Sequence, residues 1–176
     1  MINIWHDIEP NRISPEKFVA CIEIPKGGKN KYELDKGTGM LILDRVLYTS
    51  THYPANYGFI PRTYSSDGDP LDVLVLCQES IVPLTLVTCK PIGVITMIDD
   101  HEIDEKIIAI PTRDPSLSGY SEISQLPEHT FIEISHFFNV YKTLEKKEIN
   151  VKDILGRAEA VAVIKNAMEH YIECFG

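Results

Sequence analysis

The chain has 176 residues, 44% of them hydrophobic, and a formal net charge of −9. This length suits one domain with a substantial apolar core, so we expect residues 1–176 to form a single domain. The acidic balance disfavours nucleic acid or an anionic membrane as partner, and any anionic substrate must be met by local cations or by metal ions.

The N-terminal residues and the cysteines indicate a protein of the cytoplasm. The opening stretch MINIWHDIEPNR lacks the basic flank and apolar core of a secretory signal, and no apolar run reaches membrane-spanning length. The four cysteines form no C-x-x-C pair, and Cys21, Cys77 and Cys89 lie in or at the end of apolar runs. We therefore expect a soluble cytoplasmic protein whose thiols are reduced and buried.

Short apolar segments separated by turn residues occupy residues 17 to 110 and predict β-strands. They are FVACIEI, YELD, MLILDRVLY, VLVLC, IVPLTLVTCKPIGVITMI and KIIAI. Strands at this spacing predict a small, mostly antiparallel structure that is a closed or nearly closed barrel.

After Pro127 the apolar residues repeat with helical spacing. One predicted helix has a face formed by Phe131, Ile134, Phe138 and Tyr141. A second helix is expected after Gly156, with an apolar stripe formed by Val161, Ile164, Met168, Tyr171 and Ile172. Strands that come first and helices that come last predict an α+β fold that is mostly β.

Two clusters of acidic residues lie beside the predicted core strands. The stretch SSDGDPLDVLVL, residues 65–76, carries Asp67, Asp69 and Asp72 directly before an apolar segment. The second cluster is DDHEIDE, residues 99–105, where five of seven residues are acidic.

The position of these clusters depends on how residues 81–98 fold. Two separate strands would put the clusters at opposite ends of the sheet, whereas one long bent strand would put them at the same end. Pro91 and Gly93 favour the bend, because Pro and Gly inside a strand commonly mark a barrel corner. We therefore expect both clusters at one mouth of the barrel.

Crowded carboxylates need compensating cations. At surface-like dielectric, carboxylates a few ångströms apart repel by roughly 1 to 4 kcal/mol per pair. Oxygen ligands alone select hard ions such as Mg²⁺, which carboxylates, waters and substrate phosphates hold together. The alternative is a pair of solvated acidic loops, which the D-G-D-P-x-D spacing beside core strands disfavours.

Separate cations and phenols accompany the acidic residues. Lys31 and Glu33 project to the same face of a predicted strand, and Arg45 interrupts another strand. An exposed strand face and core packing are the alternatives for such Arg and Tyr residues. Together with an acidic metal pocket, however, Lys, Arg and Tyr side chains indicate a phosphate-transfer site. Motifs of other chemistries are missing, since the chain has no phosphate-binding loop, nucleophile elbow or H-E-x-x-H motif.

These segments together resemble the soluble family I inorganic pyrophosphatases. The resemblance covers roughly residues 17–146 and the closing helix, and rests on DGDPLD followed by VLVL, IEIP followed by KYELD, YPANYGFIP, MIDDHEIDEK and HFFNVYKTLE. It implies a five-stranded OB-type closed barrel with two main helices packed outside. It also implies an inorganic diphosphatase, assembled as a homohexamer, that binds several Mg²⁺ ions per site. Such an enzyme hydrolyses pyrophosphate by direct attack of a metal-activated water, without a covalent enzyme intermediate.

The resemblance also implies residue roles. Asp67, Asp72 and Asp104 match the principal metal ligands, with Asp99 joining Asp104 at the ion that arrives with substrate. Asp69 matches the general base that takes a proton from the nucleophilic water. The positions that match groups holding the substrate phosphates are Lys31, Arg45, Tyr57, Tyr141 and Lys142. Those that match outer pocket residues are Glu23, Glu33, Tyr53 and Lys106.

Three alternatives to a pyrophosphatase remain. A small barrel can bind single-stranded nucleic acid, which would show a salt-dependent affinity that the net charge disfavours. The same metal pocket could act on a nucleotide or another phosphoanhydride, which an assay with ATP beside pyrophosphate distinguishes. A catalytically inactive family member is the third alternative, and the presence of the expected residue type at every matched catalytic position argues against it.

Overall fold

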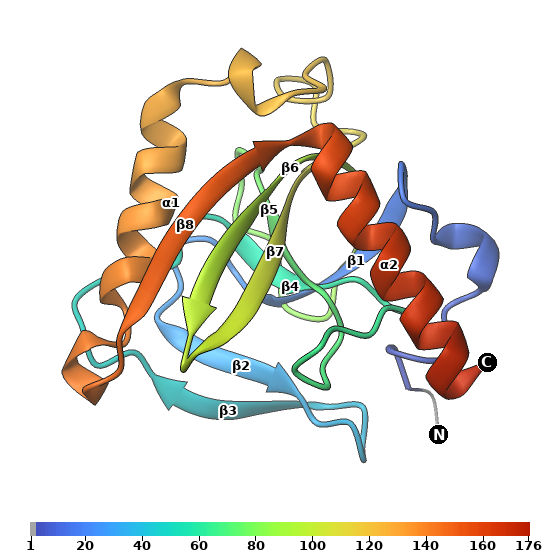
Figure 1. The fold of residues 1–176 in the computed structure, drawn as a ribbon, viewed down its shortest axis with the longest axis horizontal. Coiled ribbons are helices and arrows are strands. Elements are labelled where there is room, and N and C mark those ends of the chain that lie inside the picture. The colour runs from blue at the N-terminus through green and yellow to red at the C-terminus, as the bar shows by residue number, and fades with distance from the viewer. Residues whose placement is uncertain (1–2) are drawn as a thin grey trace.

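The computed structural model describes residues 3–176, and a ring of strands lies at its centre (Figure 1). The strands are β1 (Phe18–Ile24), β2 (Asn30–Leu34), β3 (Leu41–Val46), β4 (Asn56–Phe59), β5 (Asp72–Val75), β6 (Leu86–Asp99), β7 (Glu102–Pro111) and β8 (Ile149–Gly156). The helices are α1 (Glu128–Val140) and α2 (Arg157–Phe175), with short 3-10 turns η1 (Pro10–Arg12), η2 (Ile123–Gln125) and η3 (Thr143–Glu145).

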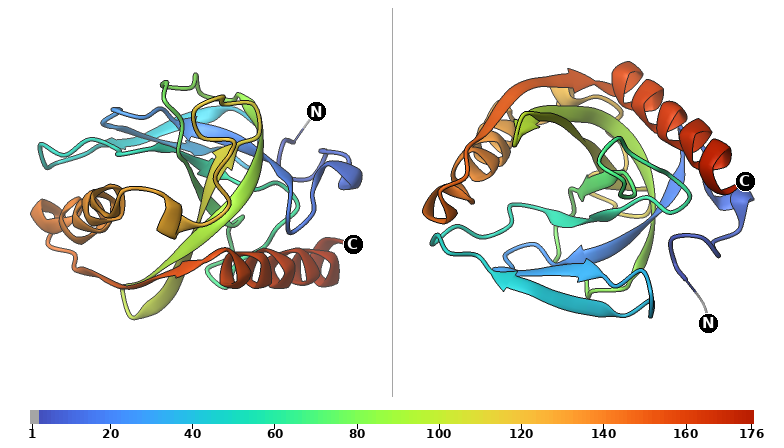
Figure 2. Two further views of the ribbon diagram at one scale, coloured as in Figure 1. Left: turned by 90° about the horizontal axis from the view of Figure 1, so that it is seen from above. Right: turned by 60° about the horizontal axis from the view of Figure 1, so that its bottom comes forward.

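Five strands close on themselves. The sheet order is β1-β4-β5-β7-β6-β8, and β1 also pairs with β6, so that β1, β4, β5, β7 and β6 form a ring to which β8 is added. The pairing of β5 with β7 is parallel and the others are antiparallel. The expected five-stranded, OB-like closed barrel is confirmed, and β2 and β3 form a separate hairpin beside it (Figure 2).

The strand β6 bends, as expected, at Pro91 and Gly93. It runs for 14 residues, and its register against β7 shifts between these two positions. A side chain at Gly93 would meet the main-chain oxygen of Leu155 at 2.6 Å and Ile123 Cγ2 at 2.5 Å, so only glycine fits where β8 and η2 approach. The strand begins at Leu86 rather than at Ile81.

The bend brings the two acidic clusters to the same end of the sheet. The turn between β6 and β7 consists of Asp100 and His101, whose φ angles of 51° and 73° are those of a two-residue hairpin of type I′. Parallel pairing then sets Asp72, at the start of β5, beside Lys106 of β7. One mouth of the barrel therefore carries both clusters, which confirms the expectation from the bent strand.

Both faces of the central strands are buried, each against a different helix. Val73 and Val75 of β5 belong to an apolar cluster that includes Ile164 of α2. Leu74, between them, belongs to a second cluster that includes Phe138 of α1. This explains why the strands are nearly continuous apolar runs rather than alternating ones. Within residues 3–176, neither helix has the combination of length and apolarity that a membrane crossing requires.

Several details differ from the expectations. The strands β4 and β8 were not predicted. The buried residues of α2 are Ala160, Ile164, Ala167 and Tyr171. Ile172 is 61% exposed because it lies outside this stripe, and Val161 is only half-buried. All four cysteines are free, but Cys77 is only partly buried and Cys174 is exposed at the end of α2.

Candidate active site

A cavity of about 300 Å³ opens at the mouth that carries the two acidic clusters. Its wall includes most of the residues predicted to form the site, namely Lys31, Tyr57, Asp67, Asp69, Asp72, Asp99, Asp104, Tyr141 and Lys142. Of the expected outer residues, Glu23, Glu33 and Lys106 also line it. Tyr53 does not, since it is buried behind Tyr57 with their ring centroids 5.4 Å apart.

The loop between β4 and β5 presents its three aspartates through a tight turn. The main-chain N–H of Gly68 donates to Ser65 O (3.1 Å), and the N–H of Ser65 donates to Asp69 O (2.8 Å). Asp67 Oδ1 accepts from the N–H of Asp69 (3.1 Å). Gly68 has a φ of 86°, a left-handed conformation that glycine adopts without strain. The D-G-D spacing therefore exposes Asp69 at the turn while Asp67 braces it.

A buried lysine links the carboxylates of the two clusters. Lys106, 3% exposed, donates to Asp72 Oδ2 (2.6 Å), Asp104 Oδ1 (3.1 Å) and the Tyr57 hydroxyl (2.9 Å). Tyr57 in turn donates to Asp72 Oδ2 (2.6 Å). The family resemblance placed Lys106 among the outer residues, and the sequence alone could not show these contacts because they depend on the parallel pairing of β5 with β7.

Ion pairs cover other parts of the wall. Lys142 Nζ lies 2.5 Å from Asp99 Oδ2, which joins the end of α1 to the β6–β7 turn. Lys31 pairs with Glu33, as their shared strand face predicted. Arg45 lies opposite Lys31 in the β2–β3 register but outside the cavity wall, where it pairs with Asp44 and Glu145. The cavity therefore contains four of the five predicted substrate-binding residues.

The cavity wall also includes Trp5 of the N-terminal segment and Lys36 of the β2–β3 turn, which the sequence analysis missed. Trp5, 5% exposed, lines the cavity and donates from Nε1 to Thr63 O (2.9 Å). The ammonium of Lys36 lies 5.4 Å from the centroid of a Trp5 ring and pairs with Asp69. Neither residue shares a motif with the acidic clusters, so their proximity depends on tertiary structure alone.

Glu23 is a buried acid at the base of the cavity. It is 8% exposed, and Oε1 accepts from the N–H of Leu34 (2.8 Å). Burial, followed by the nearby charge of Asp72, raises the pKa of Glu23 to about 8. Its carboxyl is therefore mostly protonated at neutral pH in the metal-free protein.

The donor set fits Mg²⁺. Seven acidic side chains and four lysines line the cavity, and burial together with neighbouring carboxylates raises the pKa of Asp67. Within residues 3–176, no three His, Cys, Asp or Glu side chains already surround one metal-sized position. Mg²⁺ suits such an open arrangement, because it usually keeps several waters and takes one or two carboxylates plus substrate phosphates.

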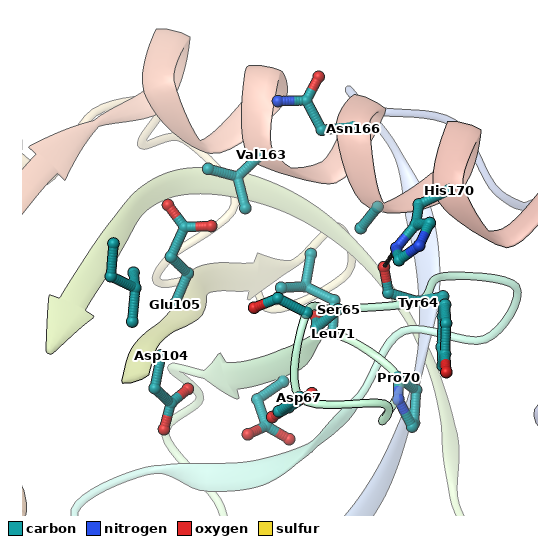
Figure 3. A pocket seen from close by; sticks show the side chains of 14 residues that line it. Tyr64, Ser65, Asp67, Pro70, Leu71, Asp104, Glu105, Val163, Asn166 and His170 are labelled. Atoms are coloured by element: carbon teal, nitrogen blue, oxygen red, sulfur yellow. Dashed lines mark hydrogen bonds between the residues drawn. The ribbon is translucent and has the colours of Figure 1, made fainter. Parts of the chain in front are cut away.

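A second cavity, of about 240 Å³, lies behind the acidic loop (Figure 3). It shares Asp67, Asp72 and Asp104 with the first cavity. Figure 3 shows Asp67 and Asp104 across this space from His170 of α2, whose Nδ1 lies 3.1 Å from Tyr64 O. Three of the four expected metal ligands therefore line both cavities, whereas Asp99 lines only the first.

Comparisons with known proteins identify the family. A sequence model described as "Inorganic pyrophosphatase" matches residues 20–172. "Soluble inorganic pyrophosphatase 2" of Chlamydomonas reinhardtii is 52% identical over 173 residues, which cover 96% of this chain and 90% of the relative. "Soluble inorganic pyrophosphatase 1" of Arabidopsis thaliana is 47% identical, covering 96% of this chain and 80% of the relative.

Solved structures agree in fold. The inorganic pyrophosphatase of Thermus thermophilus superposes with a TM-score of 0.93 at 35% identity, covering 97% of this chain and 99% of the other. That of Helicobacter pylori gives 0.90 at 41% identity, covering 94% and 99%. The chain therefore belongs to the family I inorganic pyrophosphatases and, as a member of that family, is an inorganic diphosphatase.

Proposed function

We propose that the acidic cavity hydrolyses pyrophosphate to two phosphates in the presence of Mg²⁺, by direct attack of a water molecule and without a covalent enzyme intermediate. The observation that carries this proposal is the excess of acidic side chains over lysines around a single cavity. Mg²⁺ bound there would make a coordinated water more acidic and would offset charge on the phosphate oxygens.

Four aspartates are the proposed metal ligands. Asp67, Asp72 and Asp104 would hold the resident ions, and Asp99 with Asp104 would hold an ion that arrives with pyrophosphate. Their support is the oxygen-only donor set and the raised pKa of Asp67, which reflects burial beside like charges. Several Mg²⁺ ions per site are in keeping with this number of carboxylates.

Asp69 is the proposed general base. It lies on the exposed turn at Gly68, while the carboxylates of its neighbours face the cavity from β5 and β7. A carboxylate in this position can accept the proton of a water that attacks the phosphorus atom. The ammonium of Lys36, which pairs with Asp69, must move aside or be displaced for that water to approach.

Four lysine and tyrosine side chains and Arg45 are the proposed contacts for the phosphates. Lys31 and Lys142 supply positive charge on the wall, and Tyr57 and Tyr141 supply hydroxyls. Arg45 lies beside Lys31 on the neighbouring strand and would reach the phosphates from behind it. Cations from both sides would stabilise the charge that develops on the leaving phosphate.

We further propose that the protein acts in the cytoplasm as a homohexamer, without nucleic-acid or membrane partners. The net charge of −9 supports the absence of polyanionic partners. Relatives named soluble inorganic pyrophosphatases support the compartment. The hexamer rests on the family resemblance.

The direct test is phosphate release from pyrophosphate across a Mg²⁺ titration, with a metal-free control and with ATP as the comparison substrate. We expect Mg²⁺-dependent release from pyrophosphate and little from ATP, because the sequence has no extended Gly-rich or aromatic base-stacking element that would favour a nucleotide. Equal release from both substrates would assign the cavity to phosphoanhydrides in general. Folded protein that releases phosphate from neither substrate would contradict the proposal.

A further inference from the structure

Glu145 is a partly buried acid outside the cavity wall, and the proposed reaction leaves it without a role. It is the last residue of η3, four residues after Tyr141, and its side chain is 14% exposed. Its Oε1 lies 2.9 Å from Nε of Arg45, whose side chain is 21% exposed. The pair is therefore largely screened from water, where a charge contact has more effect than one on an open surface.

Asp44 holds the other edge of the same guanidinium. Arg45 Nη1 donates to Asp44 Oδ2, and this oxygen also lies 3.7 Å from Lys31 Nζ. Lys31 and Arg45 are partners in the β2–β3 register. Two acids therefore fix the guanidinium by its Nε edge and its Nη1 corner, next to a lysine of the cavity wall.

The contact with Glu145 leaves hydrogen-bonding capacity unused. Nε of Arg45 and Oε2 of Glu145 are both buried, and neither has a hydrogen-bond partner. The two groups therefore attract as charges without a well-aligned N–H···O bond. Buried polar atoms are nearly always paired, so this contact acts mainly through charge.

The same contact connects the two sides of the cavity. Tyr141 and Lys142 immediately precede η3 and line the wall at the end of α1. Arg45 belongs to β3, in the hairpin that is separate from the barrel sheet. In Figure 1 the chain after α1 descends to the end of β3, where the two segments meet. Glu145 thus ties the hairpin to the segment that carries two other proposed phosphate contacts.

We propose that Glu145 is a positioning residue for Arg45. Its carboxylate holds the Nε edge of the guanidinium and sets the separation between Arg45 and the Tyr141–Lys142 segment, so that cations from both sides meet the phosphates together. The proposal rests on the proposed function, and in particular on Arg45 as a phosphate contact.

The test compares Glu145→Gln with Glu148→Gln, which removes the same charge from an exposed position three residues away. With Mg²⁺ saturating, we expect Glu145→Gln to raise the KM for pyrophosphate about tenfold, as for one lost charge-assisted contact, with a smaller fall in kcat. Glu145→Asp keeps the charge on a shorter side chain and should recover part of this loss. Glu148→Gln should leave KM unchanged.

Repeating the substitution in the Arg45→Lys variant distinguishes a loss of Arg45 positioning from general damage to the fold. If Glu145 acts through Arg45, then Glu145→Gln should change KM less than about twofold when it is added to Arg45→Lys, whereas independent sites give multiplied effects. An unchanged KM in Glu145→Gln, or the full tenfold change in the Arg45→Lys background, would overturn the inference. If Glu145→Gln does not fold, the same comparisons are made with Glu145→Asp.

The same measurements distinguish a wrong role for Glu145 from a wrong proposed function. A wild-type protein that releases phosphate from pyrophosphate, together with an unaffected Glu145→Gln, overturns only the role of Glu145. A wild-type protein without this activity overturns both.

Discussion

Lys106 limits how much net negative charge the cavity holds before a metal ion arrives. Burial alone lowers the pKa of Lys106, but the attraction of Asp72, Tyr57 and Asp104 outweighs it, and this pKa lies well above its usual value. The ammonium therefore stays charged and offsets part of the carboxylate charge. The remaining charge is what makes the cavity a site for divalent cations.

The raised pKa of Glu23 also makes the free energy of unfolding depend on pH. The folded carboxyl ionises near pH 8, whereas its ordinary pKa is 4.5, so its protonated form favours the folded state. In metal-free buffer the stabilisation by the protonated carboxyl is fully present below pH 4.5, and it is lost as the pH rises from there through about 8. We expect Glu23→Gln, whose amide oxygen can still accept from Leu34, to remove this dependence. At pH 8.5 the variant should be a few kcal/mol more stable than the wild type, at about 1.4 kcal/mol per pKa unit.

Urea unfolding at pH 5.5 and 8.5 in the presence of EDTA measures this difference. The exposed Glu173→Gln is the control for the loss of one negative charge. Wild-type and Glu23→Gln proteins whose stabilities change in parallel between the two pH values would show that Glu23 ionises normally.

At the scale of elements, the closure of the barrel depends on how closely β4 approaches β1. A Cβ atom at Gly58 would lie 1.9 Å from the main-chain oxygen of Cys21, which cannot move as a flexible side chain could. We expect Gly58→Ala to lower the free energy of unfolding by about 3 kcal/mol or more, since overpacking against backbone displaces a core strand. The control is Gly119→Ala, where no atom lies within 4 Å of the new methyl group. Equal urea midpoints for the two variants would refute this account of closure.

The observed strands also show which of them the sequence pattern can predict. β1 is buried throughout, and β5, β6 and β7 contain long buried stretches, so their apolar runs were sufficient to predict them. β4 was missed because Pro54 and Gly58 give YPANYGF the composition of a turn, although Gly58 is required by a backbone contact. β8 was missed because it adds to the outside of the ring, where its exposed and half-buried residues leave little apolar signal.

At the scale of the whole molecule, the site divides into a part that local spacing predicts and a part that it does not. The acidic clusters were found because several carboxylates are close in sequence, and the bent strand brought them together. Trp5 comes from a segment without a matched motif, and Lys36 directly follows the matched stretch KYELD but was not assigned to the site. Tertiary contacts place them: the N–H of Arg62 donates to Trp5 O (2.9 Å), and the ammonium of Lys36 lies 5.4 Å from the centroid of a Trp5 ring. Glu145 is likewise recognisable only once β3 and η3 are seen to meet.

Different parts of the fold supply the residues that are proposed for different roles in the cavity. The barrel supplies Asp72 and Asp104 on adjacent strands, the loop supplies Asp67 and Asp69, and α1 with the hairpin supplies cations. Metal binding and proton transfer are therefore assigned to different residues, and substitutions should separate them.

The most direct measurement of this claim is a Mg²⁺ titration of phosphate release from pyrophosphate by the wild type, Asp69→Asn and Asp72→Ala. Asp69→Asn should lose turnover by roughly 10²-fold or more while its Mg²⁺ midpoint stays near the wild-type value, because an amide cannot accept the proton. Asp72→Ala should require a higher Mg²⁺ concentration, because it lacks a ligand. Undiminished turnover in Asp69→Asn, or an unshifted Mg²⁺ midpoint in Asp72→Ala, would contradict the assignment of the cavity as a metal-dependent active site with these roles.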